Sequence, residues 1–148
     1  MDDLDSGILG ALMVDGRVTW SDLANRFGVS SPAIGERVRR LEKRGIIRGY
    51  RVVVDPVQLG YDITAFVAVV LEHPQHRQTF LDYVAATAAV QECHHVAGDG
   101  DYLLKVRCGQ MADLERILSD EIKGLPGILQ TKTSIALSTV KETTALAV

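Results

Sequence analysis

The spacing of apolar residues changes near residue 60, and this change divides the chain into two parts with different secondary structure. Over residues 3–45 the apolar side chains recur every three or four positions, which is the period of amphipathic helices. From Asp62 onwards the period is two residues, and the stretch Ile63–Leu71 is apolar on both faces. A strand of that kind must be covered twice, so we expect the second part to be a sheet with cover on each side.

Three helices are predicted in the first part. They are expected at residues 3–14, as a short helix between Thr19 and Gly28, and from Ser30 or Ser31 to Gly45. Thr, Ser and Asp side chains accept hydrogen bonds at the start of a helix, and glycine is common just past its end. Two short helices joined by a tight turn, after a first helix, indicate a helix-turn-helix.

A run of β-branched residues follows the third predicted helix. Residues 46–54 alternate in the manner of a strand and stop at Asp55-Pro56, which predicts a wing or linker strand. With this strand, residues 1–55 become a winged helix-turn-helix domain. The remaining expected parts are a linker at 56–61, a second domain at 62–137 and a C-terminal extension at 138–148 that is either ordered or frayed.

Positive charge is concentrated in the third predicted helix and just after it. Residues 35–51 contain seven Lys and Arg and two Glu, a local charge of +5, whereas the net charge of the chain is −3. Such a patch is typical of DNA-binding proteins, although a solvated helix face can look the same. The helix-turn-helix pattern favours double-stranded DNA as the partner. The expected contact residues, opposite the apolar positions of the helix, are Ser30, Ser31, Ala33, Glu36, Arg37, Arg40, Lys43 and Arg44.

The second part is predicted to be a ferredoxin-like βαββαβ domain, which makes the whole chain α+β. The expected strands are Ile63–Leu71, Val90–Ala97, Tyr102–Cys108 and Ile128–Leu137. The expected helices lie around Phe80 and Val84 and from Met111 to Ile122. Helices cover only one face of such a sheet. We therefore expect a second copy of the chain to cover the apolar face around Val67 and Val69, giving a homodimer.

Two segments carry a specific pattern: Glu36–Tyr50, with the sequence ERVRRLEKRGIIRGY, and Val96–Lys105, with the sequence VAGDGDYLLK. Together they closely resemble the Lrp/AsnC family of feast/famine transcriptional regulators, and the resemblance spans nearly the whole chain. It implies a winged helix-turn-helix domain, an effector-sensing βαββαβ domain, dimers joined through that domain and often rings of four dimers, which are octamers. It also implies a ligand, commonly an amino acid, near Gly98–Tyr102 where two dimers meet. Gly35 departs from the family pattern, and we expect it to allow close approach of the backbone to DNA.

The turn Gly98–Tyr102 has the chemistry to hold both ends of an amino acid. Backbone amides at its glycines can bind a carboxylate, and Asp99 or Asp101 can pair with an ammonium group. Asp and Gly are also the commonest residues of an ordinary turn, which is the competing interpretation. The expected effector residues are Gly98, Asp99, Gly100, Asp101 and Tyr102, with Thr131 and Thr133 as polar neighbours. A ligand held between dimers would favour one assembly and change the spacing of the DNA-binding domains.

Other functional classes find less support in the sequence. We expect no metal, because His94 and His95 are adjacent on a strand and point to opposite faces, and Cys93 and Cys108 are expected to be reduced thiols. No catalytic or phosphate-binding motif appears, so neither an enzyme nor a cofactor is expected. The alternatives are a small ferredoxin-like enzyme with an accessory helical domain and a structural oligomer. No apolar run is long enough for a membrane span, and the acidic N-terminus lacks a secretory signal, so a cytoplasmic protein is expected.

Overall fold

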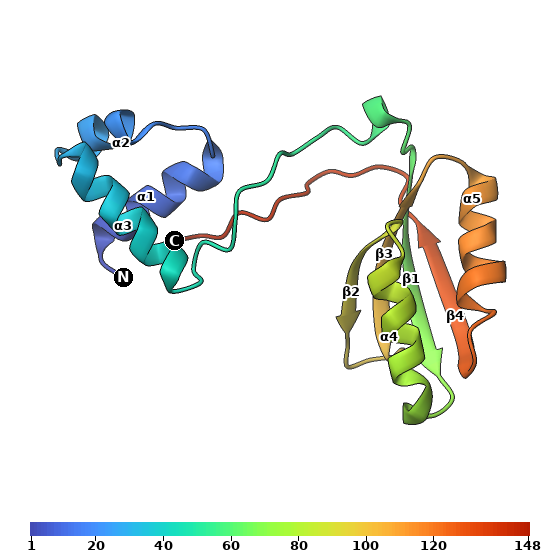
Figure 1. The fold of residues 1–148 in the computed structure, drawn as a ribbon. Coiled ribbons are helices and arrows are strands. Elements are labelled where there is room, and N and C mark those ends of the chain that lie inside the picture. Colours follow the sequence, from blue (N-terminus) through green and yellow to red (C-terminus); the bar gives the residue numbers. More distant parts are fainter. The chain divides into compact units, whose positions relative to one another are not determined.

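The computed structural model describes residues 1–148, which form two compact units. The first unit consists of Met1–Val53 together with Lys141–Val148, and the second of Val54–Val140. Helices are the only regular structure in the first unit, whereas the second contains a sheet and helices (Figure 1). None of the helices is long and apolar enough to cross a membrane.

The first unit contains the three predicted helices. They are α1 (Asp3–Val14), α2 (Trp20–Phe27) and α3 (Ser31–Lys43). The Thr19 hydroxyl caps α2 by accepting the backbone N–H of Asp22 at 3.1 Å, and Ser30 caps α3 in the same way. Gly28 ends α2 with a φ of 68°, a left-handed conformation that favours glycine. The helix boundaries therefore follow the capping residues in the sequence.

A small apolar core holds these three helices together. Ile8 of α1, Leu23 of α2 and Ile34 of α3 are all completely buried in it. Burial of a side chain of this size contributes about 1.5–3 kcal/mol to folding. The core fixes one side of α3 against α1 and α2, so the opposite side of α3 is left to solvent.

Residues 46–54 form neither helix nor strand, so the prediction of a wing strand there is wrong. Val52 and Val53 are 87% and 94% exposed. A strand exists only when its backbone is hydrogen-bonded to a neighbouring strand, and the first unit contains none. The β-branched residues therefore form an exposed connection. Residues 136–148, after the last strand, also lack regular structure.

The second unit is built around a four-stranded antiparallel sheet. Its strands are β1 (Ile63–Leu71), β2 (Val90–His95), β3 (Tyr102–Cys108) and β4 (Ile128–Ile135), in the spatial order β2-β3-β1-β4. The predicted order βαββαβ is confirmed. Strands β2 and β4 each end two residues earlier than the alternation of the sequence predicted.

Two helices lie on one face of this sheet (Figure 1). They are α4 (Arg77–Ala86) and α5 (Met111–Glu115), which continues as a π-helical segment, Arg116–Ile122. Single 3-10 turns at Val57–Leu59 and Pro74–His76 precede β1 and α4. Phe80 of α4 and Ile117 of the π-helical segment pack with Leu104 of β3 in the main core. This arrangement is the ferredoxin-like sandwich expected from the sequence.

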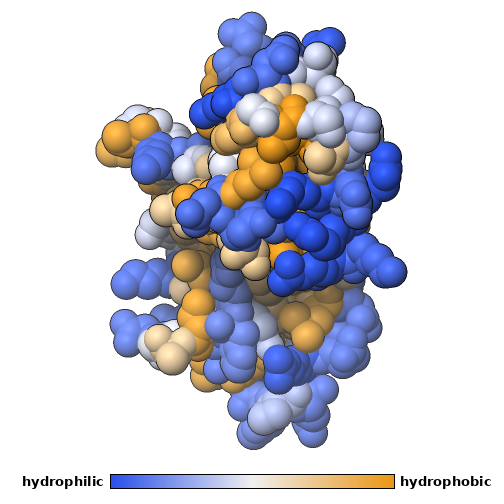
Figure 2. Space-filling model, turned by 90° about the vertical axis from the view of Figure 1, so that its left-hand side faces the viewer, coloured by the Kyte–Doolittle hydropathy of each residue, from blue (hydrophilic) through white to orange (hydrophobic).

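The two faces of β1 differ in what covers them. Val67 and Val69 are fully buried beneath the helices, so the expectation that their face needs a second copy of the chain is wrong. The face without helices carries Phe66, which is 41% exposed, and the half-buried Ala68 and Val70. On the side of the molecule drawn in Figure 2, apolar residues reach the surface in patches among polar ones. Because helices cover the other face, a partner that packs on the sheet would contact Phe66, Ala68 and Val70.

Candidate DNA-binding helix and effector cavity

One face of α3 is exposed to solvent, and this face is basic. The exposed residues of α3 are Pro32, Glu36, Arg39, Arg40, Glu42 and Lys43, so three cations accompany two carboxylates. The opposite face, which carries Ile34, Val38 and Leu41, is buried in the core of the first unit. A helix that is anchored along one side and basic along the other has the form of a recognition helix for the major groove of DNA.

The structure separates the eight residues expected to contact DNA into two groups. The exposed group consists of Ser30, Glu36, Arg40, Lys43 and Arg44. The half-buried group, at the flanks of α3, consists of Ser31, Ala33 and Arg37. Side chains of the first group are accessible to DNA without rearrangement of the helix.

Arg37 does not face outward as expected, because two carboxylates at the start of α1 hold its guanidinium. Its Nη1 atom donates to Asp2 and to Asp5, each at 2.7 Å. Asp5 is buried, and it forms a second ion pair with Arg40 at 3.2 Å. The hydrogen bond from Arg37 lowers the pKa of Asp2. Burial acts to raise the pKa of Asp5, but the hydrogen bond from Arg37 helps to keep that pKa below its usual value.

Gly35 is covered by protein and is not open to DNA, which corrects the expectation from the sequence. It is buried beneath the indole ring of Trp20, the first residue of α2. The guanidinium of Arg39 lies over the same ring, with its central carbon 5.5 Å from a Trp20 ring centroid. Such cation–π contacts contribute about 0.5–1 kcal/mol at exposed sites. Gly35 thus allows α2 to pack closely on α3.

Arg39 is the basic residue of this face that the sequence prediction left out. It is exposed, and it lies three positions after Glu36 and four before Lys43. Residues at these spacings share one face of a helix, so the helical period alone was enough to find it. The contact with Trp20, which holds the side chain, comes from another helix and was not visible in the sequence.

In the second unit, Asp101 attaches the turn between β2 and β3 to the end of β1. Its backbone N–H donates to the carbonyl of Val69 at 2.9 Å. Its carboxylate accepts the backbone N–H of Leu71 at 2.7 Å. The backbone amide of Asp101 is therefore already hydrogen-bonded within the unit. Its carboxylate has acceptor positions left, since an ionised carboxylate offers about four lone pairs.

Asp101 and Tyr102 line a cavity of about 190 Å³ at this end of the sheet. The other lining residues are Leu71, His73, Pro74, Arg77 and His95. The Tyr102 ring lies between two aromatic neighbours, with its centroid 4.9 Å from that of Phe80 and 5.0 Å from that of His95. The cavity is small compared with the pockets of roughly 300–1,000 Å³ that take drug-sized ligands. Its size suits a metabolite as small as an amino acid.

The hydroxyl of Tyr102, one of the residues that line this cavity, is unusual. It is buried and has no hydrogen-bond partner in the protein. Buried hydroxyl groups nearly always have a partner, because leaving one unpaired costs about 1–3 kcal/mol. The hydroxyl oxygen has almost no solvent-accessible surface, so it is an unpaired atom of the interior.

The other residues expected at the effector site do not line this cavity. Gly98 and Asp99 are exposed in the turn, and Gly100 packs beside the carbonyl of Val69. Thr131 and Thr133 are half-buried on β4, where they pair with Val69 and Val67 of β1. The cavity also contains His73, Arg77 and His95, which the sequence prediction did not name. No local pattern relates His95 to the other two, because it comes from a different segment of the chain.

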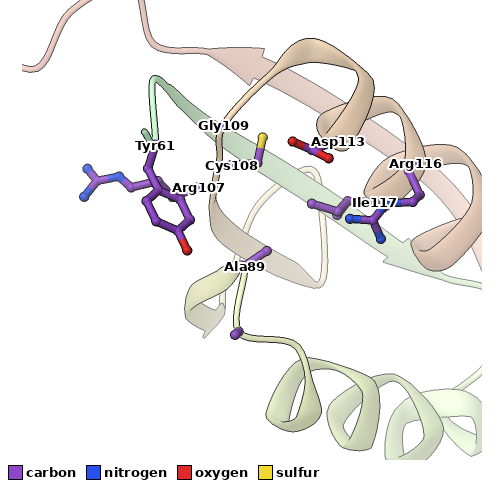
Figure 3. A pocket seen from close by; sticks show the side chains of 9 residues that line it. Tyr61, Ala89, Arg107, Cys108, Gly109, Asp113, Arg116 and Ile117 are labelled. Atoms are coloured by element: carbon purple, nitrogen blue, oxygen red, sulfur yellow. The ribbon is translucent and has the colours of Figure 1, made fainter. Parts of the chain in front are cut away.

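A second cavity, of about 210 Å³, lies near the start of α5 (Figure 3). Its charged side chains already have partners within the unit. Arg116 pairs with Glu121, Asp113 accepts the backbone N–H of Gln110, and Arg107 donates to Thr64. The Cys108 thiol beside them has its pKa raised by burial. These groups stabilise the fold and leave no buried polar atom that calls for a ligand.

His94 and His95 lie on opposite faces of β2, as adjacent strand residues should. His94 is 3.2 Å from Glu92, which also pairs with Lys105. His95 stacks on Tyr102 on the other face. No group of three or more His, Cys, Asp or Glu side chains is arranged to hold a metal ion.

Comparison with known proteins places both units in one family. The AsnC-type helix-turn-helix domain matches residues 1–42, and the Lrp/AsnC ligand binding domain matches residues 64–146. The leucine-responsive regulatory proteins of Klebsiella pneumoniae and Escherichia coli K12 are each 36% identical to this chain over 150 residues. These matches cover 100% of this chain and 92% of each relative.

Solved structures of this family have the same fold. AsnC of Escherichia coli matches with a TM-score of 0.92 at 34% identity, over 98% of this chain and 97% of its own. A transcriptional regulator of Neisseria meningitidis in complex with L-methionine matches with a TM-score of 0.95 at 28% identity, over 99% and 96%. The feast or famine regulatory protein of Mycobacterium tuberculosis complexed with L-methionine matches at 0.91 and 34%, over 99% and 98%. The resemblance noted in the sequence is thus confirmed: the chain belongs to the Lrp/AsnC family, as a DNA-binding transcriptional regulator with an effector-binding domain, and is not an enzyme.

Proposed function

We propose that this regulator binds double-stranded DNA through the outward face of α3, and that an amino acid bound in the second unit changes this binding. The observation that carries the DNA assignment is the exposure of Arg39, Arg40 and Lys43 on a helix whose other side is buried. These cations can meet phosphates and base edges without any change in the fold of the unit. Such a protein acts where the DNA is, in the cytoplasm.

Different parts of α3 are suited to different contacts with DNA. Ser30 and Ser31 stand at its N-terminal end, the part of a recognition helix that commonly reaches base edges. Lys43 and Arg44, at the other end, are suited to phosphates, which set affinity and make it depend on salt. Arg37 acts indirectly, because its ion pairs with α1 hold α3 in position.

An amino acid is the effector that fits the second unit best. The cavity beside the turn brings together a carboxylate on Asp101 and a cation on Arg77. Two relatives of the same fold hold L-methionine, and two others are named for their response to leucine. L-methionine and L-leucine are therefore the first compounds to test on this chain.

The sheet face without helices is the surface we assign to a homodimer. Phe66, Ala68 and Val70 place apolar surface there that the unit itself leaves partly open. A second copy of the chain would remove this surface from water on both partners at once. Further assembly of dimers into an octamer would bring several helix-turn-helix units onto one DNA. An effector that binds one assembly better than another would then shift the population and alter DNA binding.

The decisive experiment measures DNA binding and assembly on the same samples. The full chain is mixed with labelled genomic DNA fragments, with L-methionine, with L-leucine or with neither, and bound DNA and the mass of the complex are recorded. We expect selected fragments to bind, affinity to fall steeply with salt, and one of the amino acids to change affinity or mass.

Two variants make this experiment specific to α3. Replacement of Arg39, Lys43 and Arg44 together by Gln should abolish selective binding, and it leaves the ion pair between Arg40 and Asp5 in place. Replacement of Lys123 and Lys141 by Gln should leave it intact, because these exposed lysines lie outside the proposed surface. Selective binding that survives the first change would overturn the proposed DNA surface. If neither amino acid changes the DNA affinity or the mass of the complex, the proposed class of effector is overturned.

A further inference from the structure

The segment directly after α3 carries positive charge that the proposed DNA surface does not use. From Lys43 to Arg51 the chain has four cations and no carboxylate, and two of these cations, Arg48 and Arg51, lie beyond the helix and outside that surface. Both are exposed, and neither forms an ion pair. Cations without a partner in the protein can bind phosphates of a nucleic acid without first breaking another contact.

Contacts at two points hold this segment against the end of α3. The backbone N–H of Ile47 donates to the carbonyl of Leu41 at 3.3 Å, and its half-buried side chain packs on the core of the first unit. Further along, the Tyr50 hydroxyl donates to the Glu42 carboxylate at 3.0 Å. Arg48 lies between these two anchors, so its backbone is held near the C-terminal end of the helix.

The second anchor places the segment next to the basic face of α3. Arg39 precedes Glu42 by three positions, so their side chains are neighbours on one side of the helix. Tyr50 is therefore bonded to the side of α3 that carries Arg39, one of the residues proposed to contact DNA. A segment that is already held in this way loses less freedom on binding than a loose one, which favours affinity.

We propose that this segment forms a second contact with DNA, in which Arg48 and Arg51 bind phosphates beside the groove that α3 enters. The hydrogen bond between Tyr50 and Glu42 is a positioning contact, because it holds the segment against the helix. The inference rests on the proposed function, since DNA is the ligand it assumes. Guanidinium groups bind phosphate oxygens through charge-assisted hydrogen bonds, and such contacts add affinity without reading the base sequence.

The test compares the full chain and its variants on two DNA duplexes over a range of salt concentrations. One duplex is the genomic fragment that binds best, and the other has the same length and composition in scrambled order. Arg48 and Arg51 are changed together to Gln or together to Lys, and Tyr50→Phe is made in the wild type and in the Gln double variant. The control changes Lys123 and Lys141 to Gln, which removes the same number of charges from exposed residues outside the segment.

Loss of two phosphate contacts has a specific signature. The Gln double variant should bind both duplexes about tenfold more weakly, by the same factor, and its slope of log affinity against log salt should become shallower by about two. The Lys double variant and the control should behave like wild type, because a phosphate contact needs a positive charge and tolerates either side chain. Tyr50→Phe should weaken binding severalfold in the wild type. It should have no effect in the Gln double variant, where the groups that it positions are gone.

The outcomes separate this inference from the proposed function. If wild type binds neither duplex, the proposed function fails, and this inference fails with it. If wild type binds and the Gln double variant keeps the same salt slope, only this inference is overturned. A larger loss on the selected fragment than on the scrambled duplex would show that the segment reads bases and would overturn the assignment to phosphates.

Two further measurements complete the test. An equal effect of Tyr50→Phe in the wild type and in the Gln double variant would overturn its role as a positioning residue. Thermal unfolding of each variant shows whether a loss of binding comes from a loss of structure. For an unstable Gln double variant, the single changes Arg48→Gln and Arg51→Gln take its place, and each should make the salt slope shallower by about one.

Discussion

The indole ring of Trp20 lies so close to Gly35 that a Cβ atom at position 35 would be 2.6 Å from its Cζ3 atom. Real Cβ atoms do not approach a neighbour so closely, and therefore only glycine fits without movement of the ring. Glycine inside a helix costs roughly 0.5–1 kcal/mol relative to alanine. The contact between α2 and α3 offsets this cost, and it also fixes the ring on which Arg39 rests.

Gly35→Ala should destabilise the first unit although alanine is the better helix former. The clash with the Trp20 ring is expected to cost about 1–3 kcal/mol, more than the gain in helix propensity. Urea unfolding followed by circular dichroism measures the change. The double variant Trp20→Leu, Gly35→Ala should be more stable than the sum of the two single changes predicts. A Gly35→Ala protein more stable than wild type would contradict this account of the glycine.

Arg39→Gln should weaken DNA binding and leave the fold nearly unchanged. Loss of one specific contact costs about 1–3 kcal/mol of binding free energy, or roughly 5- to 150-fold in affinity.

Arg37→Gln should instead lower the urea midpoint of unfolding, because it leaves the buried Asp5 with one partner fewer. Fluorescence of the single tryptophan reports unfolding, and a salt titration reports DNA contacts. Equal DNA affinity for wild type and Arg39→Gln would remove Arg39 from the interface.

The ion pairs of Asp2 and Asp5 should make the first unit less stable in acid. Both pKa values are lowered in the folded state from a usual value of 3.8. Their contribution is therefore fully present above the unfolded pKa and is lost as the pH falls through the folded pKa. Asp5→Asn should unfold at a temperature lower by about 5 °C near neutral pH, with a smaller further loss on acidification. Melting curves between about pH 2 and pH 7 test this, and parallel curves for wild type and variant would refute it.

Tyr102→Phe should be neutral or stabilising for the protein. Its hydroxyl is buried and bonds to no protein group, so its removal spares an unpaired polar atom. We expect a free energy of unfolding unchanged or higher by up to about 1 kcal/mol. A clear loss of stability in Tyr102→Phe would show that the hydroxyl has a partner within the fold.

Phe66→Asp should separate the dimer without unfolding the second unit. Phe66 is partly exposed on the sheet face without helices, whereas Val67 is fully buried under them. A buried carboxylate without a partner is strongly destabilising, so Val67→Asp should lose folded structure instead. Sedimentation velocity and circular dichroism distinguish these effects. A folded Phe66→Asp protein with the same mass as wild type would place the dimer interface elsewhere.

Local interactions explain why many features were predictable from the sequence. Thr19 caps a helix three residues away, and Gly28 ends the same helix, so both act within a single turn. The strand Ile63–Leu71 was predicted with the correct first and last residue. Side chains of a strand point alternately to its two faces, so a strand leaves a two-residue pattern in the sequence. Residues 46–54 show the same kind of pattern but form no strand, because pairing needs a neighbour that the segment does not encode.

By itself, then, the sequence determined the helices, the order of helices and strands along the chain, and the concentration of positive charge in α3, which follow from local patterns, and it also indicated the family. Only the tertiary structure decided which of these side chains are free to act. Arg37 is paired with Asp2, 35 positions away, and the cavity at Tyr102 is completed by Arg77 from α4. Contacts between residues so distant along the chain depend on how elements pack, because packing brings together groups that no local period relates.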